Sequence, residues 1–293
     1  MSAAGLGSLA ARPAPRAVLE LLKPITWFAP MWAFGCGVVS ARWSGHILPV
    51  VAGVVLAGPM VCGTSQAVND WFDRHVDALN EPGRPIPSGR IPGRWGLAIA
   101  IFWTLLSLLV ATLLGRVGFA AAVVGLALAW AYSAPPLRLK MNGWWGNAAV
   151  AVCYEGLPWI TGAAVTGGTT PGAEVLILAA LYSAGAHGIM TLNDFKSEAG
   201  DRRMGIRSLP VQLGVAWAAV VACVVMASPQ AVAAALLIAW GAPGHAAAVA
   251  VLLLVQLGLM RRLLRAPREM APWYNATGTS LYVLGMLACA LAV

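Results

Sequence analysis

Residues 47–77 decide the fold: they read ILPVVAGVVLAGPMVCGTSQAVN, followed directly by DWFDRHVD. The first part is uncharged and reaches the ~20 residues that a helix needs to cross a bilayer. The second part holds Asp70, Asp73 and Asp77. A charge near hydrocarbon costs several kcal/mol, so membrane proteins keep such groups mainly for function. The stretch therefore predicts a membrane helix that ends in a functional acidic cluster.

A second cluster repeats this pattern later in the chain. The first reads Asn-Asp-x-x-Asp-x-x-x-Asp from residue 69, and the second reads Asn-Asp-x-x-x-Glu-x-x-Asp from residue 193. An Arg-x-x-Pro segment follows each, at 84–87 and 207–210. The repetition predicts an internal duplication whose two acidic faces lie opposite each other across one central cavity, a common plan for membrane sites.

The composition indicates a membrane protein. Of the 293 residues 59% are hydrophobic and 10% are charged, whereas soluble domains carry about 25% charged residues. Apolar runs recur from residue 24 to the end. We expect an all-α polytopic membrane protein, with a disordered N-terminal tail at 1–20 and a single membrane domain at 21–293. The five cysteines stand singly, which favours packing over metal binding or disulfides.

The number of spans depends on how residues 209–241 are divided at Pro229. If this stretch is one helix, 17 of the 19 cations lie on one side of the membrane and only Arg42 and Arg116 on the other. The positive-inside bias favours that solution. It predicts nine transmembrane helices around a central cavity, with the N-terminus cytoplasmic and the C-terminus outside. The expected helices lie near 24–43, 47–69, 95–114, 117–135, 144–165, 174–193, 209–241, 245–264 and 274–293.

The two clusters have the chemistry of a magnesium site. If each helix continued through its cluster, the acids of that cluster would share one helical face and repel one another. Carboxylates and Asn carbonyls suit Mg²⁺, which usually binds one or two carboxylates together with substrate phosphates. The candidate metal ligands are Asp70, Asp73, Asp77, Asp194, Glu198 and Asp201. An exposed ion-pair network is the alternative, which the repeated spacing disfavours.

Cations near the clusters predict that the bound phosphate is a diphosphate. Arginine can clamp phosphate oxygens with two hydrogen bonds, and lysine adds a point charge. About half of these cations serve membrane topology alone in our interpretation. The candidate diphosphate-binding cations are Arg84, Arg138, Lys140, Lys196, Arg202 and Arg207. Magnesium, a diphosphate and an apolar cavity together suggest a prenyl diphosphate. The basic charge does not indicate nucleic acid binding, because no soluble basic domain is present.

Three segments carry a family resemblance: NDWFDRHVDALNEPGRPIPSG at 69–89, YSAPPLRLK at 132–140 and NDFKSEAGDR at 193–202. From about residue 20 onward the chain resembles the UbiA superfamily of intramembrane prenyltransferases, and within it the branch of chlorophyll and bacteriochlorophyll synthases. The resemblance implies a nine-helix bundle with Asp-rich motifs after the second and sixth helices. It also implies a place in the cytoplasmic, inner or intracytoplasmic membrane of a phototrophic bacterium.

The resemblance further implies residue roles and substrates. The five aspartates of the motifs, Asp70, Asp73, Asp77, Asp194 and Asp201, would hold Mg²⁺ and diphosphate in catalysis, whereas Glu198 matches the pattern less closely. The resemblance also adds candidate diphosphate-binding residues: Asn69 and Asn193 would orient the metal and diphosphate, and Tyr132, Arg138 and Lys140 would contact the diphosphate. The substrates would be geranylgeranyl or phytyl diphosphate and bacteriochlorophyllide or chlorophyllide. A propionate of the macrocycle would attack C1 of the prenyl chain and release diphosphate. Protein partners are unknown.

Two alternatives remain besides the choice of pigment. One is an aromatic prenyltransferase of quinone synthesis, and the other is a cation-coupled transporter. A propionate with a pKa near 4.3 is already ionised at neutral pH, so it needs no catalytic base, and the chain has only four histidines. The clusters share one membrane face and leave no polar path across, which disfavours a transporter.

Two ionisable residues fall inside predicted helices and away from their ends, Glu155 and His187. His187 precedes the second cluster and could ligate the pigment magnesium, but a satisfied core histidine is the favoured interpretation. Glu155 is either a protonated, hydrogen-bonded core residue or a contact to a polar edge of the pigment. We keep both residues as candidate pigment contacts.

Overall fold

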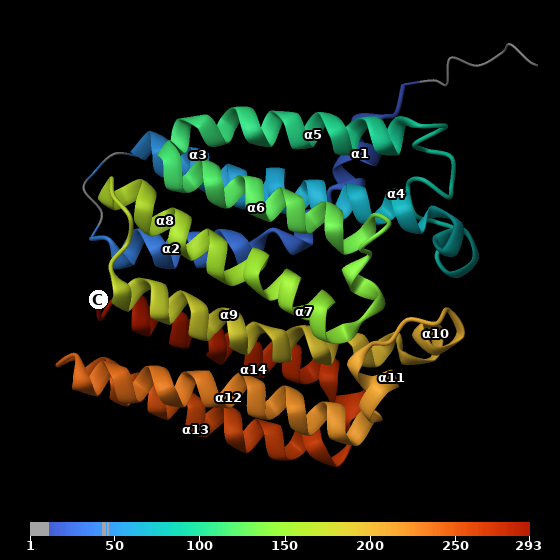
Figure 1. Ribbon diagram of the computed structural model, residues 1–293. Coiled ribbons are helices and arrows are strands. Elements are labelled where there is room, and N and C mark those ends of the chain that lie inside the picture. Colours follow the sequence, from blue (N-terminus) through green and yellow to red (C-terminus); the bar gives the residue numbers. More distant parts are fainter. Residues whose placement is uncertain (1–11, 43–44, 46) are drawn as a thin grey trace, which may run out of the picture.

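The computed structural model describes residues 12–42, 45 and 47–293. Within them the chain is helical nearly throughout, and the described residues form no sheet beyond an isolated bridge between Asn142 and Arg207. The long helices run side by side as one bundle (Figure 1). The predicted all-α class is confirmed.

The helices fall into two groups along the chain. The first group is α1 (Pro15–Leu21), α2 (Phe28–Ser40), α3 (Ile47–Val55), α4 (Gly63–Asn80), α5 (Trp95–Ala111) and α6 (Gly115–Ser133). The second group is α7 (Gly143–Ala151), α8 (Leu157–Gly167), α9 (Ala173–Asn193), α10 (Glu198–Arg203), α11 (Leu209–Leu213), α12 (Val215–Ala239), α13 (Pro243–Arg265) and α14 (Pro267–Ala290). A π-helical turn at Leu56–Cys62 joins α3 to α4, and another at Val152–Gly156 joins α7 to α8.

Among the described residues, six helical segments are long and apolar enough to cross a membrane. They are Ile47–Asn80, Trp95–Ser133, Gly143–Gly167, Ala173–Lys196, Val215–Ala239 and Pro243–Arg265, and α2 is a shorter apolar helix. The segment Trp95–Ser133 contains both α5 and α6. The chain turns between these two helices at Gly115, whose φ is 70°. The chain is a multi-pass membrane protein, and the count of nine spans stays a prediction.

The stretch around Pro229 forms one helix. α12 runs without a break from Val215 to Ala239 with Pro229 inside it. The short α11 precedes it, and Gly214 with φ of 76° separates the two. The prediction that the proline does not divide this stretch into two spans is therefore confirmed.

Small residues let the helix backbones touch. A Cβ atom on Gly37 of α2 would lie 2.1 Å from the Trp159 carbonyl of α8, and one on Gly162 would lie 2.1 Å from the Phe34 carbonyl. Only glycine fits such contacts, which are typical of helix packing in membranes. This tight packing joins the α2 and α8 walls of the bundle.

The predicted disordered tail needs correction in part. Residues 1–11 lie outside the described residues. Pro15–Leu21, however, form helix α1, with Ala17 and Leu21 buried against the bundle. Proline at the first helical position and the apolar residues that follow account for this helix.

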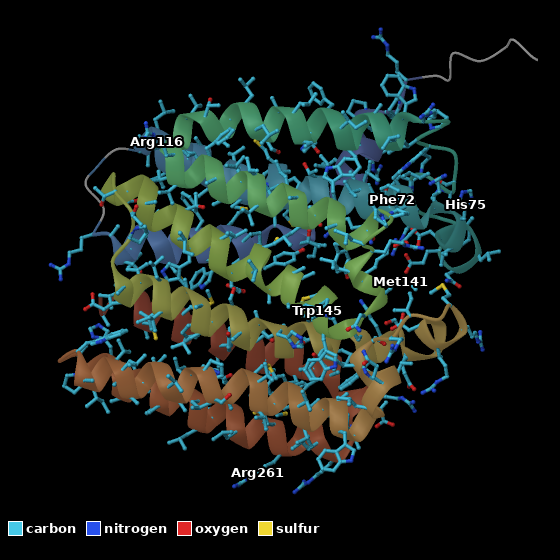
Figure 2. All side chains as sticks on the ribbon, in the orientation of Figure 1. Phe72, His75, Arg116, Met141, Trp145 and Arg261 are labelled. Carbon is cyan, nitrogen blue, oxygen red and sulfur yellow. The ribbon has the colours of Figure 1, made fainter. Side chains whose placement is uncertain are left out.

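Both acidic segments lie at the same end of the bundle. The loop after α4 and the α10–α11 segment meet there, and the C-terminus lies at the opposite end (Figure 1). His75 and Met141 lie at this shared end, whereas Arg116 lies at the other (Figure 2). Which side of the membrane this end faces stays a prediction.

Candidate functional site

Helix α4 presents three residues of the first cluster to a cavity. Asn69, Asp73 and Asp77 are spaced four residues apart, so they follow one face of the helix. Asn69 Nδ2 donates to Asp73 Oδ2 at 3.0 Å and to the Ser133 hydroxyl of α6 at 3.3 Å. Asp70 lies off this line and is only 1% exposed. The helix thus divides the cluster into three residues that line the cavity and one acid, Asp70, that does not.

Two cations from the loop after α6 contact Asp73. Lys140 Nζ lies 2.5 Å from Asp73 Oδ1, and Arg138 Nη2 lies 4.0 Å from the same oxygen. Burial lowers the pKa of Lys140 below its ordinary value, although the contact with Asp73 opposes this shift. The loop therefore places two positive charges beside the acidic helix.

Arg84 connects the other two aspartates of α4. Its Nη1 lies 2.9 Å from Asp77 Oδ2 and 3.3 Å from Asp70 Oδ1, and its Nε pairs with Glu81. Lys23 also reaches Asp70 Oδ1, at 2.7 Å. The repulsion predicted among these acids is therefore offset by side-chain cations.

The second cluster does not continue as one helix, so the condition under which its three acids would share one helical face is not met. α9 ends at Asn193, Asp194–Lys196 form a 3-10 turn, and α10 begins at Glu198. Ser197 closes the turn: its amide donates to the Asp194 carbonyl at 3.1 Å, and its hydroxyl donates to Asp201 Oδ2 at 2.9 Å. Serine commonly competes with helical hydrogen bonding in this way. The break changes which acids share a face.

Asp194 and Asp201 line the cavity, whereas Glu198 does not. Asp194 Oδ2 accepts a hydrogen bond from Asn147 Nδ2 of α7 at 3.1 Å. Glu198 instead pairs with Arg268 at the start of α14 and with Arg202 at 3.1 Å. These hydrogen bonds from the two arginines lower the pKa of Glu198. Glu198 therefore joins two helices rather than facing the other acids.

The two acidic segments enclose one polar cavity of about 410 Å³. Backbone bonds hold its rim, because the Gly143 amide donates to the Arg207 carbonyl at 2.8 Å and the Arg207 amide donates to the Met141 carbonyl at 2.9 Å. Among the described residues of its lining are five carboxylates, those of Asp73, Asp77, Glu81, Asp194 and Asp201, and three cations. The predicted residues that line it are Asn69, Asp73, Asp77, Arg84, Tyr132, Arg138, Lys140, Asp194 and Asp201.

The donors around the cavity fit magnesium shared with a phosphate. Carboxylate and amide oxygens of Asn69, Asp73, Asp77, Asp194 and Asp201 surround it. In the described part of the chain, no three His, Cys, Asp or Glu side chains lie close enough to hold a metal by themselves. Mg²⁺ usually binds one or two carboxylates, several waters and substrate phosphates. The open arrangement suits that mode better than a closed metal site made only of protein.

Six predicted residues lie outside the cavity lining. Asp70 is buried beside it, and Glu198 and Arg202 pair with each other. Asn193 accepts a hydrogen bond from Asn275 at 2.8 Å. Lys196 and the Arg207 side chain are exposed. Their predicted roles in binding metal or diphosphate stay predictions.

The two candidate pigment contacts lie apart from the acids. Glu155 is 4% exposed within the second π-helical turn, and its Oε2 has no hydrogen-bond partner. His187 stacks on Trp144 with ring centroids 5.7 Å apart, and its Nε2 lies 3.2 Å from the Trp144 carbonyl. It lines an apolar groove of about 750 Å³ rather than the polar cavity. Neither position establishes a contact with pigment.

Several polar residues of the site were not predicted from the sequence, among them Asn80, Glu81 and Ser208 of the cavity lining. Asn147 and Ser197 line the cavity and contact its acids, and Lys23 contacts Asp70 from outside. Asn147 sits in an apolar helix, and an uncharged amide there gave little signal. Lys23 stands before the first apolar run, where the positive-inside bias alone is enough to explain a cation. Ser197 lies inside the second motif, so its position alone was a usable signal.

Asn147 provides a test of the cavity. Asn147→Leu removes the donor to Asp194 while keeping the number and branching of the side-chain heavy atoms. We expect the Mg²⁺ concentration for half-maximal activity to rise about 10- to 100-fold, as for other residues that orient metal ligands. Initial rates over a Mg²⁺ titration measure this. Asn275→Leu is the matched control, since its amide bonds Asn193 outside the cavity. Equal effects of the two variants would contradict the placement of Asp194.

A narrow apolar crevice leads away from the polar cavity at Tyr132. Two pockets form it, and they share Ala57, Val61, Gly125 and Cys153. Tyr132 lines both the first pocket and the polar cavity. The crevice then runs along α6 as far as Gly118. From residue 132 to residue 118 a helix rises ~21 Å.

The crevice is nearly closed in this structure. Its two pockets hold about 30 and 40 Å³, so a chain that enters must move side chains apart. The wall is made largely of small residues from several helices, which leaves room for such movement. These include Ala57, Ala121, Ala122, Gly125, Ala129 and Ala149.

Comparison with known proteins agrees with this architecture. The sequence model of one protein family, described as the UbiA prenyltransferase family, matches residues 23–291. The bacteriochlorophyll synthase 33 kDa chain of Cereibacter sphaeroides is 59% identical over 96% of this chain and 94% of its own length. The chloroplastic chlorophyll synthase of Oryza sativa is 37% identical over 94% of this chain and 76% of its own.

The fold also matches a solved structure of a UbiA homolog from Archaeoglobus fulgidus, which was bound to GPP and Mg²⁺. The TM-score is 0.73, with 18% identity, and the match covers 94% of this chain and all of the other. At this identity the likeness supports the fold alone.

Proposed function

This chain belongs to the UbiA prenyltransferase family, as its motifs predicted, and we propose that it esterifies the propionate of bacteriochlorophyllide with a geranylgeranyl or phytyl group taken from the diphosphate. The proposal is supported by 59% identity to a bacteriochlorophyll synthase chain along almost the whole length. It is also supported by a polar cavity that opens at Tyr132 into an apolar crevice.

The polar cavity suits the diphosphate head of the donor. Arg84, Arg138 and Lys140 line it and supply positive charge. As the C1–oxygen bond breaks, the departing diphosphate keeps the bonding electrons, and these cations stabilise the charge that builds on its oxygens. When bound, magnesium would add further charge stabilisation, held by Asn69, Asp73 and Asp77 on one side and by Asp194 and Asp201 on the other.

The apolar crevice suits the tail of the donor. Tyr132 stands where the cavity meets the crevice, so its ring lies near the expected position of C1. An aromatic face there stabilises positive charge on the allylic carbon. The ~21 Å that α6 rises from this point to the end of the crevice is comparable to an extended chain of four isoprene units.

Gly125 tests the position of the tail. It lies about 10 Å along α6 from Tyr132 and lines both pockets of the crevice. Gly125→Leu should block a long tail and lower kcat/KM for geranylgeranyl diphosphate about 100-fold, while a five-carbon allylic diphosphate remains an equally good competitor. Gly125→Ala is the control, because its Cβ would meet Val61 and Leu157 at ordinary distances of 3.5 and 3.7 Å. An unaffected Leu variant would place the tail elsewhere.

The acceptor is one from which no proton has to be removed during the reaction. A propionate oxygen attacks C1 and forms the ester bond, while diphosphate leaves with the electron pair of the broken bond. The propionate is ionised at neutral pH, so no protein group has to accept a proton. Among the described residues that line the polar cavity there is no histidine. An aromatic acceptor prenylated at carbon would require such a group.

One assay tests the proposed function. Membranes containing the protein receive Mg²⁺, geranylgeranyl diphosphate and one of three acceptors: bacteriochlorophyllide, chlorophyllide or 4-hydroxybenzoate. Chromatography then measures the prenylated products. We expect the bacteriochlorophyllide ester to form fastest. Faster esterification of chlorophyllide would move the chain to the second candidate function, which the 37% identical chlorophyll synthase supports, and a prenylated benzoate alone would contradict both.

A further inference from the structure

Lys23 lies outside both acidic motifs but forms an ion pair with one of their aspartates, Asp70. Its Nζ lies 2.7 Å from Asp70 Oδ1, which Arg84 also reaches at 3.3 Å. Asp70 is 1% exposed, and its second oxygen has no hydrogen-bond partner. A buried carboxylate needs such compensation. Lys23 and Arg84 therefore balance an acid that does not line the polar cavity.

The backbone at Lys23 is shaped to deliver its ammonium group. Its φ is 47°, a left-handed conformation that non-glycine residues rarely adopt. Two hydrogen bonds fix this turn: the Thr26 hydroxyl donates to the Lys23 carbonyl at 2.8 Å, and the Trp27 indole donates to the Leu22 carbonyl at 2.8 Å. Such strain persists where the surroundings enforce it. The chain thus changes direction between α1 and α2 at the residue that pairs with Asp70.

The segment before Lys23 is anchored to the same part of the bundle. Leu21 is fully buried, and Leu22 packs so close to α4 that a Cβ on Gly63 would lie 3.3 Å from its side chain. Glu20 forms two hydrogen bonds with Arg90 of the loop after α4, at 2.5 and 2.8 Å. Since that exposed pair contributes little by itself, burial of Leu21 and pairing of Lys23 are the main attachments.

We propose that Lys23 is a positioning residue for the metal–diphosphate site and acts through Asp70. Asp70 pairs with Lys23 and with Arg84, and these two ion pairs fix how α4 is rotated about its own axis. Arg84 also holds Asp77 at 2.9 Å. In that rotation Asn69 and Asp73 face the cavity. Asp70 is then an anchor rather than a metal ligand. The inference rests on the proposed function for the meaning of the site, although its test does not depend on the acceptor.

The test is a double-mutant cycle in the full-length protein, with Mn²⁺ as the probe of the metal site. Lys23→Met leaves Asp70 buried without its nearest cation. We expect Mn²⁺ affinity, measured by electron paramagnetic resonance, to fall about 10-fold, together with kcat for prenyl transfer. The double variant Lys23→Met, Asp70→Asn should recover most of the loss. Both charges of the pair are then absent, so no buried carboxylate is left without its cation. Lys23→Arg should also recover it.

Controls separate positioning from other roles. Glu20→Gln breaks the exposed ion pair with Arg90 and should leave Mn²⁺ affinity within about 2-fold. Unchanged Mn²⁺ affinity in Lys23→Met would overturn the inference. So would a double variant no better than Lys23→Met, since Lys23 would then act without Asp70. If the wild type esterifies no pigment but the Mn²⁺ pattern holds, the proposed function fails and this inference stands.

Discussion

Asp73→Asn is expected to lower kcat/KM for prenyl transfer about 1,000-fold, the loss typical of removing a main electrostatic element of a site. Asp73 accepts from Asn69 and contacts Lys140 and Arg138. The amide keeps the shape of the side chain but removes the charge that would bind magnesium. Lys140, which is largely buried, would also lose its partner. Steady-state rates at saturating Mg²⁺ measure the change.

Glu198→Gln is the matched control for Asp73→Asn, because both residues belong to the acidic motifs. Glu198 pairs with Arg268 and Arg202, whose side chains are more than half exposed. Exposed ion pairs contribute little, so the expected loss is below about 10-fold. If Glu198→Gln were as inactive as Asp73→Asn, Glu198 would have to bind the substrate complex, and the geometry of the second cluster described here would be wrong.

Removal of divalent cations should abolish transfer, with a loss of roughly 1,000-fold or more. Five carboxylates are among the described residues that line the cavity, and the diphosphate adds further negative charge. The three cations there cannot balance that total. Treatment with a chelator, followed by Mg²⁺ back-titration and rate measurement, tests this expectation.

The choice of metal sharpens the same test. Mg²⁺ suits a small site that it shares with phosphate and water, whereas Ca²⁺ prefers more ligands at longer distances. We expect Mg²⁺ to restore the full rate and Ca²⁺ to restore less. Retention of activity in the presence of excess chelator would show that Arg84, Arg138 and Lys140 alone stabilise the departing diphosphate.

Much of the fold was predictable because hydrophobic length and charge are properties of the chain itself. The uninterrupted α12 followed from the distribution of arginines, although Pro229 alone favoured neither solution. The 3-10 turn at Asp194–Lys196 was not predictable, because the spacing of Asp194, Glu198 and Asp201 fits a continuous helix equally well. Helix α1 was missed because Pro15–Leu21 is too short to give a membrane signal.

The order of the residues was sufficient to establish the membrane class, the two acidic motifs and the family, and to predict a site for magnesium and diphosphate. Those conclusions depend on which groups the chain carries and how far apart they stand along it. Packing decided which acids face one another. Helix rotation turned Asp70 towards Lys23, the bend at Ser197 turned Glu198 towards Arg268, and an amide on α7 came into contact with Asp194. These contacts join residues distant in sequence, and side-chain direction at each depends on local backbone turns that spacing alone does not specify.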